Sequence, residues 1–207
     1  MNTLVKDRLT PVTSQQFAST MSEAWPVHFV TPASKSSVLV LTAQSVLETG
    51  WWKYCHNYNL GNMKSVAGDG WDYSFFACDE VLYTPVALKF QAASTPAAPC
   101  KITSQNPHNN TSTIWFYPDH PGCRFRAFCM KKPDGSIDEA ASLRAGMDAH
   151  LNTLYKRFGL AWPAVLKGDP RAFVQALKAQ GYFTAPEKPY EDSVAEIFEE
   201  LQKTVTI

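Results

Sequence analysis

Residues 41–64, with the sequence LTAQSVLETGWWKYCHNYNLGNMK, decide how the rest of the chain is interpreted. They begin inside a continuous apolar run from Val38, which is typical of a helix buried on all sides. The run ends in Glu48, and Gly50, Trp51 and Trp52 follow at once. The segment therefore predicts a carboxylic acid at the end of a core helix, beside aromatic rings.

The predicted position of Glu48 favours its neutral form. Ser34, Ser36 or Ser37 can cap the start of the helix. Gly50 suits the left-handed residue that ends it, so Glu48 lies in the last turn, where the helix dipole places partial negative charge. This charge and the nearby indole surface both raise the expected pKa of Glu48. Such an acid can protonate a glycosidic oxygen, and the alternative is a solvated glutamate at a helix end.

Two motifs of this segment resemble a known family. AQSVLETGW, residues 43–51, is similar to the ALETGW-type helix end of the glucosaminidase family of the lysozyme superfamily. That family includes bacterial autolysins, flagellar rod-associated wall hydrolases and phage lysins. NLGNMK, residues 59–64, resembles the NLFGIK turn of the family, but Gly61 and Asn62 stand where Phe and Gly are usual.

The C-terminal third carries a second block of resemblance. DPRAF, residues 169–173, and LKAQGYFT, residues 177–184, resemble the closing segment of the family, and Tyr190 fits the tyrosine that opens its last helix. The resemblance implies a peptidoglycan hydrolase that cleaves a β-1,4 glycosidic bond, most often as an N-acetylglucosaminidase, with Glu48 as the catalytic acid. Muramidases and lytic transglycosylases share the same acid and helix, so they stay as alternatives. No cofactor or metal is implied.

The chain divides into three parts, which together predict an α+β, lysozyme-like domain over residues 1–207. Residues 1–66 have the pattern of helices, including one near residues 14–25. Residues 67–135 form a divergent, cysteine-containing strand-and-loop lobe, because turn residues separate short apolar runs. Residues 136–207 return to helices, with Ser136 and Glu139 as a capping box and Asp169 before Pro170 as a second helix start. A cleft between the two lobes would suit a polysaccharide.

Several residues near Glu48 are candidates to bind the glycan. Aromatic rings pack on the apolar faces of sugars, and turn asparagines can bind N-acetyl groups. The candidates are Trp51, Trp52, Asn59, Asn62 and Tyr182, and Tyr190 is a further catalytic candidate. The alternatives are core aromatics and turn residues that tolerate left-handed conformations.

A glycosidase generally needs a second carboxylate or a substitute for it. Glu80, in the predicted strand lobe, is favoured for this role, while Asp79, Asp72 and Asp119 are rivals. The substrate's own N-acetyl group is the alternative, and then Glu80 is an ordinary surface residue.

All five cysteines fall between residues 55 and 129, at Cys55, Cys78, Cys100, Cys123 and Cys129. Their spacing does not match a zinc site. Clustering in a loop-rich lobe predicts disulfides, such as Cys123 with Cys129 and Cys78 with Cys100. Five reduced thiols are the alternative. Cys55 with a histidine could also make the protein a cysteine-dependent wall amidase.

Charge and hydropathy argue against several classes of protein. Nineteen basic and nineteen acidic residues leave no basic footprint for nucleic acid, and no apolar run is long enough for a signal peptide or a membrane span. We expect a monomer that acts on peptidoglycan strands in the periplasm or the extracellular wall. Such a protein would be released by lysis, or exported by a dedicated secretion machine as an antibacterial effector with an inhibitor protein in its producer. A non-catalytic wall-binding module and an interaction protein on the same fold are the other classes.

Overall fold

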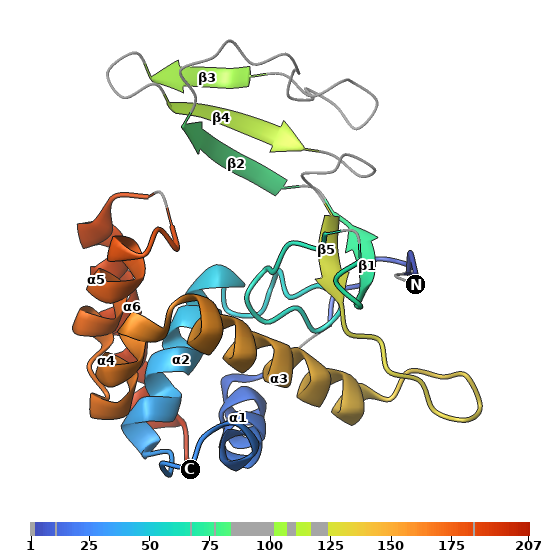
Figure 1. The fold of residues 1–207 in the computed structure, drawn as a ribbon, viewed down its shortest axis with the longest axis horizontal. Helices are drawn as coiled ribbons and strands as arrows, with labels where there is room; N and C mark the ends of the chain where they lie inside the picture. Colours follow the sequence, from blue (N-terminus) through green and yellow to red (C-terminus); the bar gives the residue numbers. More distant parts are fainter. Residues whose placement is uncertain are drawn as a thin grey trace. The chain divides into compact units, whose positions relative to one another are not determined.

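The computed structural model describes residues 3–10, 12–66, 68–76, 78–83, 102–106, 111–116, 124–183 and 185–207. Within 78–83, 102–106 and 111–116 it describes the backbone alone. Described helices and antiparallel strands follow one another in separate stretches of the chain (Figure 1), which confirms the predicted α+β class. The chain divides into two compact units. We call residues 8–63 with 128–207 the helical unit, and residues 1–7 with 64–127 the strand unit.

Six α-helices and one short 3-10 helix are described in the helical unit. They are α1 (Ser14–His28), α2 (Lys35–Glu48), α3 (Glu139–Arg157), the 3-10 helix η2 (Gly159–Ala161), α4 (Trp162–Lys167), α5 (Pro170–Ala179) and α6 (Glu187–Thr204). α2 is central, because it packs against α1, α4 and α6. Its side chains from Ser37 to Val46 are all buried, as its continuous apolar run predicts.

Helix boundaries show which local signals in the sequence were decisive. Of the three candidate serines, Ser34 caps α2, and its Oγ accepts a hydrogen bond from the backbone N–H of Ser37 at 3.0 Å. The predicted Asp169 cap of α5 is confirmed. The Ser136 capping box is wrong, because Asp138 caps α3 by accepting from the backbone N–H of Ala141 at 3.0 Å. The Asp138 carboxylate stands one residue before the helix, where a cap must stand.

Two antiparallel sheets make up the described part of the strand unit. β1 (Asp72–Phe75) pairs with β5 (Arg124–Ala127), and a second sheet has the order β2-β4-β3, with β2 (Cys78–Tyr83), β3 (Ile102–Asn106) and β4 (Thr111–Phe116). This unit overlaps the lobe predicted over residues 67–135. The strands expected at residues 74–82, 114–117 and 123–130 correspond to β1 with β2, to β4 and to β5.

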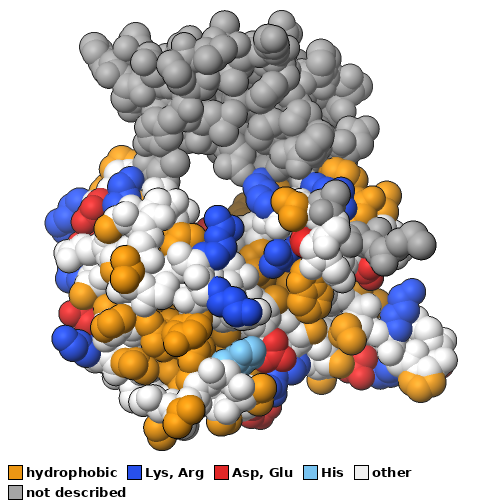
Figure 2. Space-filling view, in the orientation of Figure 1, with side chains coloured by type: hydrophobic (Ala, Val, Ile, Leu, Met, Phe, Trp, Pro, Cys, Tyr) orange, Lys and Arg blue, Asp and Glu red, His pale blue; other side chains and the backbone are white. Residues whose placement is uncertain are grey.

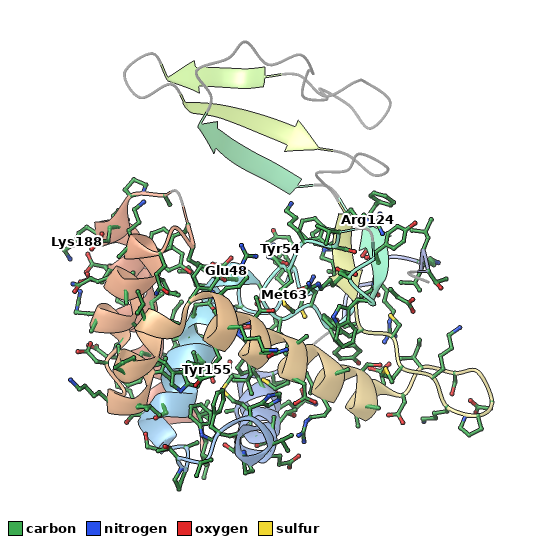
Figure 3. All side chains as sticks on the ribbon, in the orientation of Figure 1. Glu48, Tyr54, Met63, Arg124, Tyr155 and Lys188 are labelled. Atoms are coloured by element: carbon green, nitrogen blue, oxygen red, sulfur yellow. The ribbon has the colours of Figure 1, made fainter. Side chains whose placement is uncertain are left out.

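Apolar side chains gather on one face of the helical unit (Figure 2), around the place where Figure 3 labels Tyr155. The rings of Trp25, Phe29, Tyr155 and Trp162 contact one another there, at centroid distances between 4.4 and 5.4 Å. Trp25 is fully buried, whereas Tyr155 is exposed. The cluster therefore joins the C-terminal ends of α1 and α3 to the start of α4.

Candidate active site

Glu48 is the last residue of α2 and is half-exposed, whereas the four residues from Ala43 to Val46 before it are buried. Tyr190, in the first turn of α6, donates a hydrogen bond from its hydroxyl to Glu48 Oε1 at 2.7 Å. Because α2 and α6 pack against each other, this bond joins two rigid elements. The carboxyl group of Glu48 is therefore held in one orientation at the edge of the core.

The Tyr190 hydroxyl acts as a donor and not as a base. Burial, followed by the negative charge of Glu48, raises the pKa of Tyr190 well above its ordinary value. The phenol consequently keeps its proton at neutral pH. Its ring stacks on Phe183 at a centroid distance of 4.0 Å, with 9° between the planes. This stack prevents the ring from turning away from Glu48.

A second tyrosine lies beside the same carboxyl group. Tyr182 accepts a hydrogen bond from Nε2 of Gln44 at 2.6 Å, and Gln44 stands one helical turn before Glu48. Burial and then the charge of Glu48 raise the pKa of Tyr182 well above its ordinary value, so this phenol also stays protonated. Its ring meets Phe158 edge to face at 4.9 Å. Tyr182, Phe183 and Tyr190 together form an aromatic wall next to Glu48.

The chain leaves α2 in an unusual left-handed turn. Gly50, Trp51 and Trp52 have φ values of 55°, 57° and 67°, so three successive residues lie in the left-handed region. Glycine takes this conformation freely, but it is rare and strained for tryptophan. The turn sends the two indoles in different directions. Trp51 is 47% exposed, while Trp52 is only 7% exposed.

The two tryptophans consequently have different roles. The Trp52 ring packs on Phe17 at 4.9 Å, and its indole N–H donates to Ser14 Oγ at 3.1 Å. Trp52 is thus a core residue whose polar atom is already bonded, and its surface is not available to a sugar. Trp51 has an outward-facing ring, as a substrate-binding residue requires.

Sequence reasoning missed Tyr54, which is 54% exposed. Its ring lies over Gly50, where an added Cβ would come within 2.9 Å of the ring. Gly50 is therefore needed both for the left-handed turn and for the position of Tyr54. The backbone N–H of Tyr54 donates to the carbonyl of Thr49 at 2.9 Å, which places Tyr54 at the end of α2; both Tyr54 and Glu48 are labelled in Figure 3. The available signal was its spacing, because Tyr54 follows Trp51 by three residues in a turn rich in aromatics.

The turn at residues 59–63 contacts the end of α2 at Glu48. Nδ2 of Asn62 donates to the backbone carbonyl of Glu48 at 2.7 Å. The Asn59 side chain bonds both the N–H and the carbonyl of Met63, at 2.7 and 2.9 Å, and is fully buried. Asn59 therefore stabilises the turn and is not exposed to a glycan. The amide of Asn62 likewise holds the end of α2.

The departure from the NLFGIK motif has a local explanation. Asn62 has a φ of 48°, and asparagine is among the few residues besides glycine that tolerate this conformation. It stands where the family usually has glycine. A Cβ on Gly61 would meet Nδ1 of the buried His150 at 2.7 Å, so this position holds no larger side chain without a shift of His150.

Cys55 does not have the environment of a catalytic nucleophile. The thiol is free and fully buried, and burial raises its pKa to about 11. A nucleophilic cysteine needs an accessible thiolate near neutral pH. The geometry therefore argues against the cysteine amidase. Among the side chains that the structure describes there is no disulfide bond; Cys129 Sγ lies 3.6 Å from Asn57 Oδ1, and the side chains of Cys78, Cys100 and Cys123 lie outside the described set.

The second catalytic group stays a prediction. The backbone of Glu80 lies in β2 opposite Ile114, but its side chain and that of Asp79 are outside the described set, as is all of Asp119. Asp72 Oδ1 accepts a hydrogen bond from the backbone N–H of Thr3 at 3.1 Å. In the described part of the chain, no three His, Cys, Asp or Glu side chains gather as metal ligands, and no described helix is both long and apolar enough to cross a membrane.

No protein-family model matches the chain, and a search of curated proteins found no match. Among solved structures, the chain is similar to a C-terminally truncated glycoside hydrolase domain from Salmonella typhimurium FlgJ. The two share 14% sequence identity with a TM-score of 0.43, over 92% of this chain and 98% of that chain. A similarity of this size does not assign an activity to the protein.

Proposed function

We propose that this protein is a peptidoglycan hydrolase that cleaves β-1,4 glycosidic bonds, with Glu48 as the general acid. The observation that carries the proposal is the half-exposed carboxyl group of Glu48, held by the Tyr190 hydroxyl at 2.7 Å at the end of a buried helix. A general acid must be accessible to the leaving oxygen and fixed in orientation. Glu48 meets both requirements.

Each group near Glu48 has a definite role in this proposal. Glu48 gives its proton to the glycosidic oxygen as the bond to the anomeric carbon breaks. Tyr190 holds the carboxyl group in place. The positive charge that develops at the sugar ring is stabilised either by Glu80 or by the N-acetyl group of the substrate.

Two exposed rings supply the surface for the glycan. Trp51 and Tyr54 stand three and six residues after Glu48 in the chain and are 47% and 54% exposed. Because pyranose rings have apolar faces, aromatic side chains can stack on them. The left-handed turn keeps Trp51 outward, and a strained backbone beside a reactive carboxyl group is common at functional sites.

The bond proposed for cleavage is the one on the reducing side of N-acetylglucosamine, which follows from the resemblance of residues 43–51 and 59–64 to glucosaminidases. A muramidase or a lytic transglycosylase would use the same acid. We further propose that the protein acts on the wall in the periplasm or outside the cell. If it is exported as an antibacterial effector, its producer is expected to carry an inhibitor protein against it.

Mass spectrometry of purified peptidoglycan digested with the wild-type protein tests the function. New reducing N-acetylglucosamine ends would support the glucosaminidase. Reducing N-acetylmuramic acid or anhydro ends would identify a muramidase or a transglycosylase instead. Cut peptides on intact glycans would favour the amidase, and no release at all would favour a wall-binding module.

A Tyr190→Phe variant tests the role assigned to Tyr190. Phenylalanine keeps the stack on Phe183 but removes the hydrogen bond to Glu48 Oε1. We expect kcat on peptidoglycan to fall by up to about tenfold, which corresponds to the net contribution of one hydrogen bond, with little change in KM. Tyr155→Phe removes a hydroxyl from an exposed tyrosine of the same unit and should leave both constants unchanged. Equal kcat in the two variants would refute the role of Tyr190.

A further inference from the structure

The sheet of β1 and β5 has one buried face and one half-exposed face. Phe125 and Ala127 of β5 are buried, whereas Arg124 and Arg126, which alternate with them, are half-buried. In the register of the sheet, Arg124 lies opposite Phe75 and Arg126 opposite Tyr73. Opposite residues of an antiparallel pair share a face, so the half-exposed face combines two guanidinium groups with two aromatic rings.

The two arginines of this face differ in their partners. Nε of Arg126 donates to Asp69 Oδ2 at 3.0 Å, and Asp69 is almost completely buried at its side chain. The guanidinium of Arg124 lies over the ring of Tyr73 in the other strand, with its Cζ 3.7 Å from the ring centre. No described residue accepts a hydrogen bond from it, and its Nε is buried without an acceptor. Arg126 belongs to a structural ion pair, whereas among the described side chains no carboxylate pairs with the positive charge of Arg124.

An arginine in this state is suited to bind an anion. Contact with the Tyr73 ring restricts the guanidinium in advance, so less conformational freedom is lost when a ligand binds. The planar fork matches the two oxygens of a carboxylate. A half-buried position strengthens the attraction compared with open water. A merely structural arginine would instead be expected to satisfy its buried N–H groups within the protein.

We propose that Arg124 binds a carboxylate group of the peptides that substitute the wall glycan. This inference rests on the proposed function for the identity of the ligand, but it concerns a different group and a different chemistry. Stem peptides of peptidoglycan carry free carboxylates, whereas the sugar hydroxyls and N-acetyl groups are neutral. Arg124 would thus select peptide-bearing glycan over neutral glycan, although the chain has no net charge to attract it.

Calorimetric titration in the Glu48→Gln background, where the ligand is not consumed, tests the proposal. The ligands are a disaccharide–tetrapeptide muropeptide, the same muropeptide with its carboxylates amidated, and neutral chitotetraose. We expect Arg124→Gln to weaken binding of the acidic muropeptide about tenfold or more and to leave the other two ligands unchanged. Arg124→Lys should recover only part of the loss, because lysine keeps the charge but not the fork. Lys131→Gln removes a charge from an exposed position and should have no effect.

Other outcomes would overturn the proposal. Equal losses of affinity for the acidic and the amidated muropeptide would mean that Arg124 stabilises the sheet and does not recognise a carboxylate. In that case the thermal midpoint of the variant would also be lowered. Unchanged muropeptide binding, with weaker binding of a poly(glycerol phosphate) oligomer, would assign the site to a phosphate. Failure of the proposed function is distinguishable, because wild-type protein would then leave wall glycan intact while these titrations remain readable.

Discussion

Glu48→Gln is expected to lower kcat on peptidoglycan by about a thousandfold, which is within the range that a general acid contributes. Glutamine has nearly the same shape and can still accept the hydrogen bond from Tyr190 through its amide oxygen. It has no proton to give to the leaving oxygen. The loss should therefore appear in kcat, while KM and the thermal midpoint stay close to those of the wild type.

The measurement is the rate of release of new glycan ends from purified peptidoglycan. Glu196→Gln makes the same chemical change at an exposed glutamate of α6 and serves as the control. It should retain full activity. If Glu48→Gln kept more than about a tenth of the wild-type rate, general-acid catalysis by Glu48 would be excluded, since such an acid supplies at least about a hundredfold. If the thermal midpoint of Glu48→Gln also fell well below that of the wild type, Glu48 would have a structural role.

The end of α2 could be located from the sequence because its signals are local. An apolar run without polar interruptions predicts burial on all sides, and Ser34 and Gly50 have the residue types that a start and an end require. The bond between Glu48 and Tyr190 is different. These residues are 142 positions apart, and periodicity carries no information on such a contact. Only the resemblance of the C-terminal motifs suggested it.

The division of roles between Trp51 and Trp52 could not be predicted. Both residues are tryptophans, and an ordinary helix end would place neither in a left-handed conformation. Both have φ values near 60°, and Trp52 is buried by packing on Phe17 and a bond to Ser14, two residues of another helix that are distant in sequence. Residue type alone favoured a sugar-binding role for both. The same limit applies to Asn59, because its two bonds to Met63 depend on the exact closure of the turn.

Lowering the pH is expected to destabilise the protein through His150. This residue of α3 is buried, its Nε2 has no hydrogen-bond partner, and its ring packs against Gly61 and the edge of Phe17. Burial lowers the pKa of His150 from 6.5 to about 4. Between these values the unfolded chain binds a proton that the folded protein does not, so the free energy of unfolding decreases as the pH falls below 6.5.

The expected loss is about 2 kcal/mol between pH 7 and pH 5, and about 3 kcal/mol by pH 4, where it levels off. Urea unfolding followed by tryptophan fluorescence at several pH values measures it.

His150→Gln has no such titration, so its free energy of unfolding should change less over this window, even if it is lower at pH 7. The carboxylates whose pKa is lowered in the folded state, such as Asp69 and Glu139, lose their contribution mainly below about pH 5. The difference in slope between wild type and His150→Gln from pH 5 to pH 7 therefore isolates the histidine, and equal slopes there would show that folding does not lower the pKa of His150. Because Gly61 precedes the asparagine that holds the carbonyl of Glu48, protonation of His150 should also loosen the turn that contacts the proposed catalytic acid.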